Sequence, residues 1–185
     1  MTIKRRKDTE TPRVVMHRVA DIRGGVSVEV KELGGGVLLE GTPLSAPVDG
    51  ICHVIKTARL AAASAATDKA VKVAKGSHFR AGDAVMATEG GTAVKVASID
   101  NSTKEYDTIN LSAALGALAI GDAVVEAKEA GDKGELKYVP KAIAGTTKVV
   151  DPTDNLDEDA WLIAVTKGNE LPESVAKYLP GIINY

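Results

Sequence analysis

The sequence predicts a mainly β protein: a small β-barrel or sandwich domain with an extended N-terminal arm and a short C-terminal helix. Three observations support this class. Apolar and polar residues alternate with a period of two in several short runs, glycine-rich turns separate these runs, and one turn-and-strand phrase occurs twice between residues 70 and 127. At least five strand-like runs fall within that stretch. This spacing favours a barrel or sandwich over strands interleaved with helices.

The N-terminal third contains an arm, strands and one ambiguous segment. Residues 1–13 are polar and interrupted by Pro12, which is typical of an arm without a fold of its own. Strands are expected at 26–30, at 37–39 and at 52–55, with a linker at Pro43 and Pro47. The alanine-rich segment 57–67 has helical propensity but no polar face, so a helix and an extended loop both remain open.

The repeated phrase consists of a bulky apolar residue, a Gly-Asp pair and an Ala-Val run. Its copies are 79–87 and 118–127, 39 residues apart. The two aspartates, Asp83 and Asp122, raise the hypothesis of paired carboxylates for acid–base chemistry. However, aspartate directly after glycine usually accepts hydrogen bonds from nearby backbone amides and fixes a turn. The turn role is therefore the preferred interpretation.

Turn and strand signals continue around the repeat. Strands are expected around Lys72 and Lys95, with a hairpin turn at 90–91, and a second turn at 100–102 leads into 106–111. Beyond residue 131 the expected elements are strands at 136–139 and 148–150, an acidic loop at 151–159 and a strand or short helix at 160–165. A helix at 172–179, bounded by Pro172 and Pro180, and an apolar end that docks, at 181–185, complete the chain. The expected segments are 1–20, 21–56, 57–130 and 131–185.

Composition and charge point to association rather than catalysis. Only six of the 185 residues are aromatic, so the alanine- and valine-rich core buries little apolar surface per residue and is expected to gain stability from partners. Residues 1–23 carry a net charge of +4 and residues 151–185 a net charge of −5. This polarity can orient copies of the chain against each other or against a surface, and two solvated tails are the alternative. One cysteine, Cys52, excludes an intramolecular disulfide, and no signal peptide or long apolar span is visible.

Motifs for metal, phosphate or nucleophilic chemistry do not assemble in the sequence. The three histidines are far apart, the order of Lys75-Gly76-Ser77 is the reverse of a phosphate loop, and the acidic loop lacks the calcium-binding pattern. The cluster Lys4-Arg5-Arg6-Lys7 could contact phosphates, but no aromatic residue lies near it for base stacking. We therefore expect no enzyme activity, no cofactor, no metal and no nucleic-acid partner.

Two segments carry a family resemblance. Residues 70–83, and residues 106–109 through 121–127, resemble the bacteriophage head-fibre and capsid-decoration family, in particular the head-fibre proteins of tailed phages of gut Bacteroides-type bacteria. The resemblance covers about a third of the chain and consists of strand and turn phrases. It implies a non-enzymatic virion protein, made in the host cytoplasm, that assembles as a homo-oligomer on the outer capsid surface. The family offers no active-site residues, and the absence of coiled-coil heptads here favours a compact knob or short stalk.

These expectations combine into a hypothesis about attachment. The major capsid protein would be the partner, with other head proteins or host-surface glycans as further candidates. The chain itself would form a homo-oligomer, with a trimer favoured over a dimer and no membrane contact. The alternative is a host-surface or carbohydrate-binding module that uses loop 100–106, with Asn101 and Tyr106. The C-terminal residues 181–185 could dock on the shell in place of the N-terminal arm. The predicted anchoring residues are Lys4, Arg5, Arg6, Lys7, Arg13, Val14, Val15 and Met16.

Overall fold

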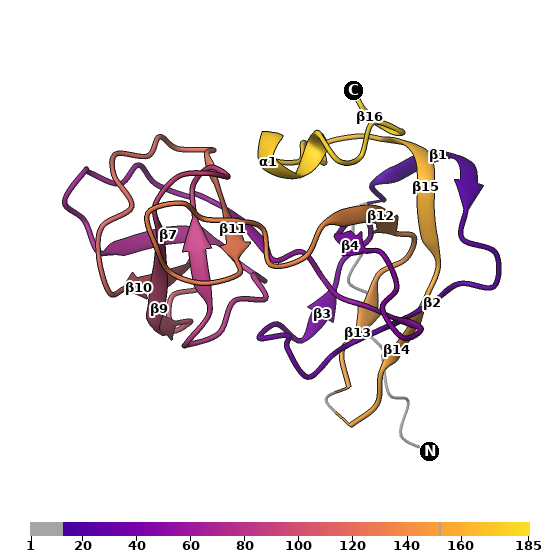
Figure 1. Cartoon of the computed structure of the whole chain (residues 1–185), viewed down its shortest axis with the longest axis horizontal. Helices are drawn as coiled ribbons and strands as arrows, with labels where there is room; N and C mark the ends of the chain where they lie inside the picture. The colour runs from indigo at the N-terminus through magenta and orange to yellow at the C-terminus, as the bar shows by residue number, and fades with distance from the viewer. Residues whose placement is uncertain (1–12, 152) are drawn as a thin grey trace, which may run out of the picture.

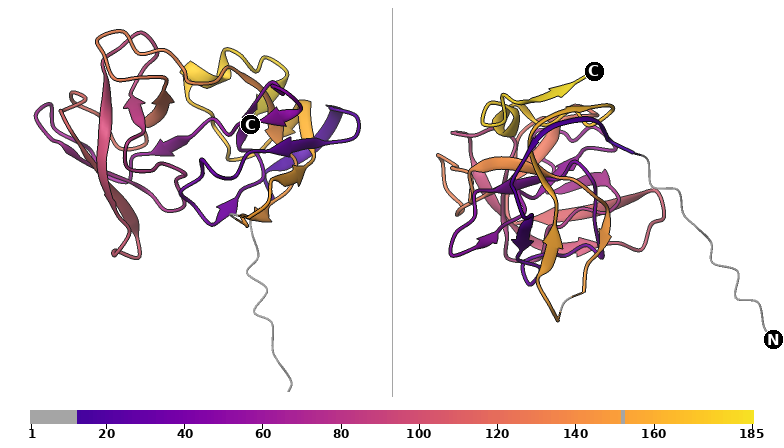
Figure 2. Two further views of the ribbon diagram at one scale, coloured as in Figure 1. Left: turned by 60° about the horizontal axis from the view of Figure 1, so that its bottom comes forward. Right: turned by 90° about the vertical axis from the view of Figure 1, so that its right-hand side faces the viewer.

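The structure is a computed structural model that describes residues 13–151 and 153–185. It consists mostly of β-strands with one short helix, which confirms the predicted mainly β class. Two lobes are visible in Figure 1 and from other directions in Figure 2. The N- and C-terminal parts of the chain together form one lobe, the terminal lobe, and residues 57–127 form the other, the repeat lobe. The chain crosses between the lobes twice, before residue 57 and after residue 127.

The terminal lobe is built on a five-stranded sheet with two small sheets beside it. The main sheet has the order β1-β15-β12-β4, and β16 also pairs with β15, in parallel. The small sheets have the orders β14-β2-β5 and β13-β3. The bounds are β1 Val15–Asp21, β2 Val26–Val28, β3 Val37–Leu38, β4 Pro43–Ser45, β5 Ile51–Cys52, β12 Pro140–Ala144, β13 Lys148–Val149, β14 Leu156–Glu158, β15 Ala160–Thr166 and β16 Ile182–Asn184.

The repeat lobe contains one six-stranded sheet with the order β6-β11-β8-β9-β10-β7. An isolated bridge between Leu60 and Val73 brings the two end strands of this order, β6 and β7, together. Valines and other aliphatic residues of the strands, together with Phe79, form the core of this lobe. The bounds are β6 Thr57–Arg59, β7 Ala70–Ala74, β8 Ala84–Met86, β9 Ala93–Asp100, β10 Tyr106–Leu111 and β11 Ala123–Ala127.

The internal repeat appears in the structure as an approximate two-fold symmetry of this lobe. The bridge between β6 and β7 makes the strand order circular. In this circle β6 corresponds to β9, β7 to β10 and β8 to β11, and corresponding strands have corresponding neighbours. Two antiparallel pairs lie on the axis that relates the halves: Lys72 faces Thr108, and Met86 faces Val125. Each half thus supplies three equivalent strands, and 39 residues separate the two Gly-Asp turns.

The two Gly-Asp turns have the same geometry. The Arg80 N–H donates to Asp83 Oδ2 over 2.8 Å, and the Ala119 N–H donates to Asp122 Oδ2 over 2.8 Å. Gly82 and Gly121 have φ values of 97° and 89°, a region that side-chain-bearing residues rarely adopt. The turn role that the sequence predicted for both aspartates is therefore confirmed.

Several predicted elements have different bounds or character. The last residues of the predicted arm 1–20 belong to β1. This strand was missed because its three register shifts disturb the alternation of apolar and polar residues that is typical of a strand. The alanine-rich segment 57–67 is extended, since β11 and loop residues provide backbone partners for it, including the bridge of Ser64 to Leu118. The acidic segment 151–159 includes β14, which pairs with β2.

The C-terminal elements largely follow the sequence prediction. Residues 160–165 lie within β15, which resolves the alternative between strand and helix. The single helix, α1 (Glu173–Ala176), is shorter than predicted, with Pro172 at its N-cap. Residues 181–185 dock through β16, as expected. The strand predicted at 136–139 is wrong in position. The strand in this region is β12, whose pairing with β4 begins only at Pro140 and whose pairing with β15 begins at Ile143.

The matched turns allow a stability test. We expect Asp122→Ala to lower the free energy of unfolding by about 1 kcal/mol, because one local side-chain hydrogen bond is lost. Asp83→Ala should cost more, since Asp83 also lies 2.7 Å from the buried Lys56 amino group. Urea unfolding of the two variants measures this difference. Equal losses would contradict a stabilising contact between Asp83 and Lys56.

Candidate interaction surface

Both ends of the described chain lie on the same sheet. β1 pairs with one edge of β15 and β16 pairs with the other, so β15 lies between them (Figure 1). The pairing extends beyond the strands, because the Lys167 N–H donates to the Val14 carbonyl and the Tyr185 N–H donates to the Thr166 carbonyl. The two segments that the sequence offered as alternative anchors are therefore neighbours.

The predicted anchoring residues divide into three groups. Lys4, Arg5, Arg6 and Lys7 lie outside the described residues. Arg13 is exposed, and Val14 is half-buried with its N–H donating to Glu40 Oε2 over 2.9 Å. Val15 is only 2% exposed and packs in the core with Ile143 and Ala164, whereas Met16 is exposed. Of the predicted apolar contacts, Met16 is thus accessible and Val15 supports the fold.

The outer face of this sheet carries an apolar patch. Val165 of β15 pairs with Ile183 of β16, and side chains two residues apart on a strand share a face, so Ile163 and Tyr185 lie on the same side. Ile163, Ile183 and Tyr185 are 43%, 59% and 65% exposed, values that are high for such residues. We give the name terminal patch to six apolar residues of these three neighbouring segments, of which Val165 is half-buried and the others are exposed, with Met16 and Val19 at the register shifts of β1: Met16, Val19, Ile163, Val165, Ile183 and Tyr185.

The edge of β1 is poorly suited to continue the sheet into another molecule. Three register shifts interrupt its pairing with β15, and His17, Arg18 and Asp21 place polar or charged groups along it. Bulges and charges are common means of preventing edge-to-edge pairing. Association at this sheet would therefore use the apolar face rather than the edge.

Cationic side chains border the terminal patch. The Arg18 guanidinium lies 5.2 Å from the centre of the Trp161 ring and 3.8 Å from the Glu40 carboxylate. The Lys167 amino group lies 5.7 Å from the centre of the Tyr185 ring. An apolar centre with a charged rim is the usual composition of a protein–protein interface.

A chain of charged side chains connects the lobes where the chain crosses between them. The Lys56 amino group lies 2.7 Å from Asp83 Oδ2 and 3.2 Å from Glu126 Oε1. The Lys137 amino group lies 3.0 Å from the same Glu126 oxygen and 3.6 Å from Glu32 Oε2 in the terminal lobe. Lys56 and Glu126 are 1% and 2% exposed, and burial raises the pKa of Glu126.

An aromatic pair completes this network on the side of the terminal lobe. The Tyr138 hydroxyl donates to Glu32 Oε1 over 2.7 Å, and His53 Nδ1 lies 3.3 Å from Glu32 Oε2. The rings of His53 and Tyr138 stack with centroids 4.1 Å apart. Burial and the bond to Glu32 raise the pKa of Tyr138 to about 12, so its hydroxyl remains a donor at neutral pH. The network, defined as Glu32, His53, Lys56, Asp83, Glu126, Lys137 and Tyr138, is called the junction network below.

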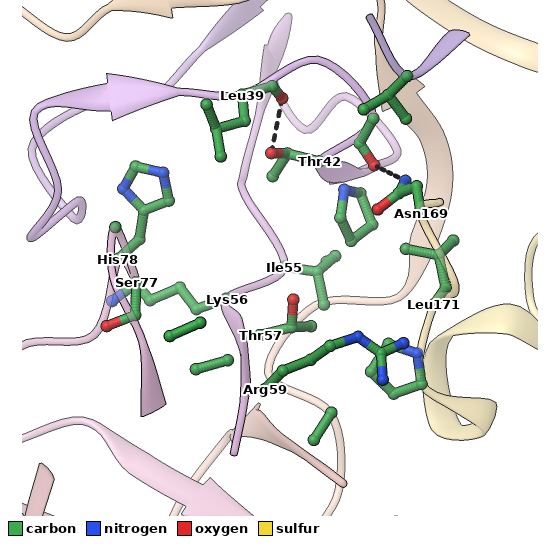
Figure 3. Close-up of a pocket in the computed structure, with 18 of the residues that line it drawn as sticks. Leu39, Thr42, Ile55, Lys56, Thr57, Arg59, Ser77, His78, Asn169 and Leu171 are labelled. Atoms are coloured by element: carbon green, nitrogen blue, oxygen red, sulfur yellow. Dashed lines mark hydrogen bonds between the residues drawn. The ribbon is translucent and has the colours of Figure 1, made fainter. Parts of the chain in front are cut away.

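A cleft of about 350 Å³ lies beside the junction network (Figure 3). Leu39 and Thr42 of the terminal lobe and Thr57 and Ser77 of the repeat lobe contribute to its lining. His78 also lines it and is itself buried. Burial, followed by the positive charge of Lys56, lowers the pKa of His78 to about 4.

Cys52 and loop 100–106 were the other candidates for chemistry or ligand binding. Cys52 is fully buried, and burial raises the pKa of its thiol. In loop 100–106, the Ser102 N–H donates to the Asp100 carboxylate, and the Lys72 amino group lies 4.8 Å from the centre of the Tyr106 ring. Across residues 13–151 and 153–185, no group of three His, Cys, Asp or Glu side chains could hold a metal ion. No helix in the described part of the chain has the length and apolar character to cross a membrane.

Comparison with known proteins gave no match: no family model, no curated protein and no solved structure is significantly similar to this chain.

Sequence reasoning missed the junction network. Its members are dispersed from residue 32 to residue 138, so no local spacing joins them. One signal was available: Lys56 and Glu126 each follow two apolar residues in a strand-like run, where a charged side chain is expected to need a partner. Which partner each would find depends on the packing of the two lobes.

The junction network predicts an asymmetric response to mutation. Lys56→Met should reduce the free energy of unfolding by roughly 3–5 kcal/mol, because Glu126 remains buried with less compensation. The double variant Lys56→Met/Glu126→Leu should recover part of that loss. Urea unfolding measures both, with the exposed Lys141→Met as the matched control. A loss for Lys56→Met as small as that for Lys141→Met would contradict the interpretation.

His78 predicts a pH dependence of stability. Its pKa is lower in the folded protein than in the unfolded chain, so the unfolded chain binds more protons between about pH 6.5 and pH 4. Stability should therefore fall as the pH decreases through this window, with a contribution from His78 of about 3 kcal/mol. Urea unfolding of wild type and His78→Asn at pH 7 and pH 4 tests this. The variant should show the smaller acid-induced loss, and an equal loss would refute the assignment.

Proposed function

We propose that this protein is a structural virion protein, a head-fibre or decoration subunit that attaches to the outside of a phage capsid through the terminal patch. The observation that supports the proposal is the convergence of β1 and β16 on β15, because both end strands of the described chain then lie beside exposed apolar side chains of one sheet. The resemblance of the repeat segments to head-fibre proteins supplies the biological setting.

The shape of the molecule is compatible with this role. The terminal patch belongs to the terminal lobe, while the strands of the repeat lobe form a separate body beside it (Figure 1). Contact through the terminal lobe would leave the repeat lobe displayed. The junction network would keep the displayed lobe in a fixed position, because its ion pairs join residues of both lobes.

Electrostatics supports a protein surface as the target. Arg13, Arg18 and Lys167 are cationic groups at or near the terminal patch, and the basic residues 4–7 precede β1 in sequence. Such charges accelerate encounter with a carboxylate-bearing surface, and the apolar centre provides the affinity. A capsid surface with an apolar site and an acidic rim is the partner we propose.

Particle binding tests the attachment surface. Capsids prepared without this protein should bind the wild-type chain, and Ile163→Glu/Ile183→Glu should reduce occupancy about tenfold or more, because two charges would be buried at the contact. Val149→Glu is the matched control, since Val149 is a highly exposed aliphatic residue on β13. Deletion of residues 2–13 measures the separate contribution of the arm. Wild-type occupancy of the double variant, measured by cosedimentation, would refute attachment through the terminal patch.

The alternative function is a host-surface or carbohydrate-binding module. Loop 100–106 is its candidate face, and Asn101 and Ser102 are exposed. A glycan array probed with the purified protein distinguishes the two functions. Specific glycan binding that is lost in Asn101→Ala would favour the alternative.

A further inference from the structure

Three side chains of the junction network come together from adjacent strands of the repeat lobe. Lys56 lies directly before β6, Asp83 directly before β8, and Glu126 within β11, which pairs with both of those strands. The Lys56 amino group lies 2.7 Å from Asp83 Oδ2 and 3.2 Å from Glu126 Oε1. The site therefore brings an amine into contact with two carboxyl groups, one of which can react with it while the other moves protons.

The internal repeat shows that the Gly-Asp turn needs only its aspartate. In the two-fold symmetry of this lobe, Lys56 corresponds to the exposed Thr92 and Glu126 to Ala87, because β9 opposite β8 matches β6 opposite β11. Asp122 forms the same turn as its counterpart, yet no side chain in the described part of the chain forms an ion pair with it. A lysine and a glutamate thus occur together around only one of two equivalent turns, which the turn alone does not explain.

Water is largely excluded from this site. Lys56 and Glu126 are 1% and 2% exposed, and the side chain of Asp83 is 16% exposed. Burial raises the pKa of Glu126, which favours a proton on its carboxyl group. Glu126 Oε2 is buried and has no hydrogen-bond partner among the described residues, so this oxygen is free to carry that proton. A buried carboxyl group with a raised pKa is well suited to accept a proton and pass it on.

We propose that Lys56 and Asp83 join in an isopeptide bond that forms within the folded chain, with Glu126 transferring the protons. The lone pair of the uncharged Lys56 nitrogen would attack Asp83 Cγ, and the C–O bond to one carboxyl oxygen would break with its electron pair going to oxygen. Glu126 would take two of the three ammonium protons in turn and pass them to this oxygen, which leaves as water. The third proton stays on the amide nitrogen, and Glu126 returns to its initial state.

The geometry favours Asp83 over Glu126 as the group that is joined. The Lys56 amino group lies closer to Asp83, and Glu126 Oε1 is shared with Lys137 at 3.0 Å. The Arg80 N–H holds the Asp83 carboxyl group in place over 2.8 Å, so the oxygen that does not accept this hydrogen bond would leave. Reacting groups held in contact have a very high effective concentration, which replaces chemical activation of the carboxyl group. Lys56 also lines the cleft, into which the water can depart (Figure 3).

The bond would fix the junction between the lobes covalently. It would tie the first crossing, at Lys56, to the Gly-Asp turn at Asp83 and close the chain from residue 56 to residue 83 into a loop. Such a link survives denaturation, unlike the ion pairs of the same groups. The inference does not depend on capsid attachment, because it concerns only side chains of this chain.

Mass spectrometry of the purified, denatured full-length protein tests the proposal. The wild type should be lighter by one water than the mass calculated from its sequence. Trypsin should release a branched peptide that joins residues 32–59 to residues 81–95, because trypsin does not cleave after an acylated Lys56. Fragmentation of this peptide should place the link at Lys56 and Asp83. The branched peptide is essential, since cyclisation of an aspartate also releases one water.

Matched variants identify the groups that react. Lys56→Arg keeps the positive charge and Glu126→Gln keeps the side-chain shape, and both should have the calculated mass and yield no branched peptide. Lys137→Arg changes the other cationic partner of Glu126 and should still lose water. Asp83→Asn should release ammonia in place of water. Circular dichroism verifies that each variant is folded.

The wild-type measurement is decisive even if a variant fails to fold. A wild type that keeps its calculated mass after prolonged incubation at neutral pH, with no branched peptide, would overturn the proposal. So would a loss of water that persists in Lys56→Arg. Undiminished bond formation in Glu126→Gln would refute the proton-transfer role of Glu126.

Discussion

The ion pairs of the buried Lys56 are the interaction on which the arrangement of this molecule depends. Lys56 lies where the chain first crosses into the repeat lobe, and its amino group contacts Asp83 and Glu126 of that lobe. Glu126 in turn contacts Lys137, which lies where the chain returns to the terminal lobe. The Lys137 amino group also contacts Glu32 of that lobe. Burying several charges is costly unless each is paired, so the two crossings and both lobes must take up compatible positions. The junction network therefore specifies geometry more than it adds net stability.

Asp83 joins this network to the internal repeat. Both Gly-Asp turns use their aspartate in the same way, but only Asp83 also receives a lysine. The duplicated halves have thus diverged where they contact the rest of the chain: the turn aspartate of the first half receives Lys56, and the second half has its β9 edge paired with the segment around Gly131. Two distinctive surfaces lie outside this network. The cleft is lined by residues of both lobes, including Thr57 and Arg59 of β6, and the terminal patch lies on the sheet formed by the two ends of the chain.

Local patterns predicted what depends on local chemistry. The mainly β class, the turn role of Asp83 and Asp122, the strand Ala123–Ala127 and the docking of residues 181–185 all follow from alternation, turn residues and apolar content. The position of β1 was hidden by its bulges, and the extended form of residues 57–67 depends on distant partners. The junction network and the terminal patch combine residues from opposite parts of the chain, so their assembly depends on topology that single-residue patterns do not contain.

Side-chain footprinting of the capsid-bound protein tests the central claim, attachment through the terminal patch, most directly. Met16 and Tyr185 are exposed in the free protein and react readily with hydroxyl radicals, whereas Met86 is fully buried and serves as an internal reference. On capsids prepared without this protein and then loaded with it, our account predicts that labelling of Met16 and Tyr185 falls severalfold, while labelling of Tyr106 in the repeat lobe stays constant. Unchanged labelling of Met16 and Tyr185, with protection of Tyr106 instead, would contradict the account.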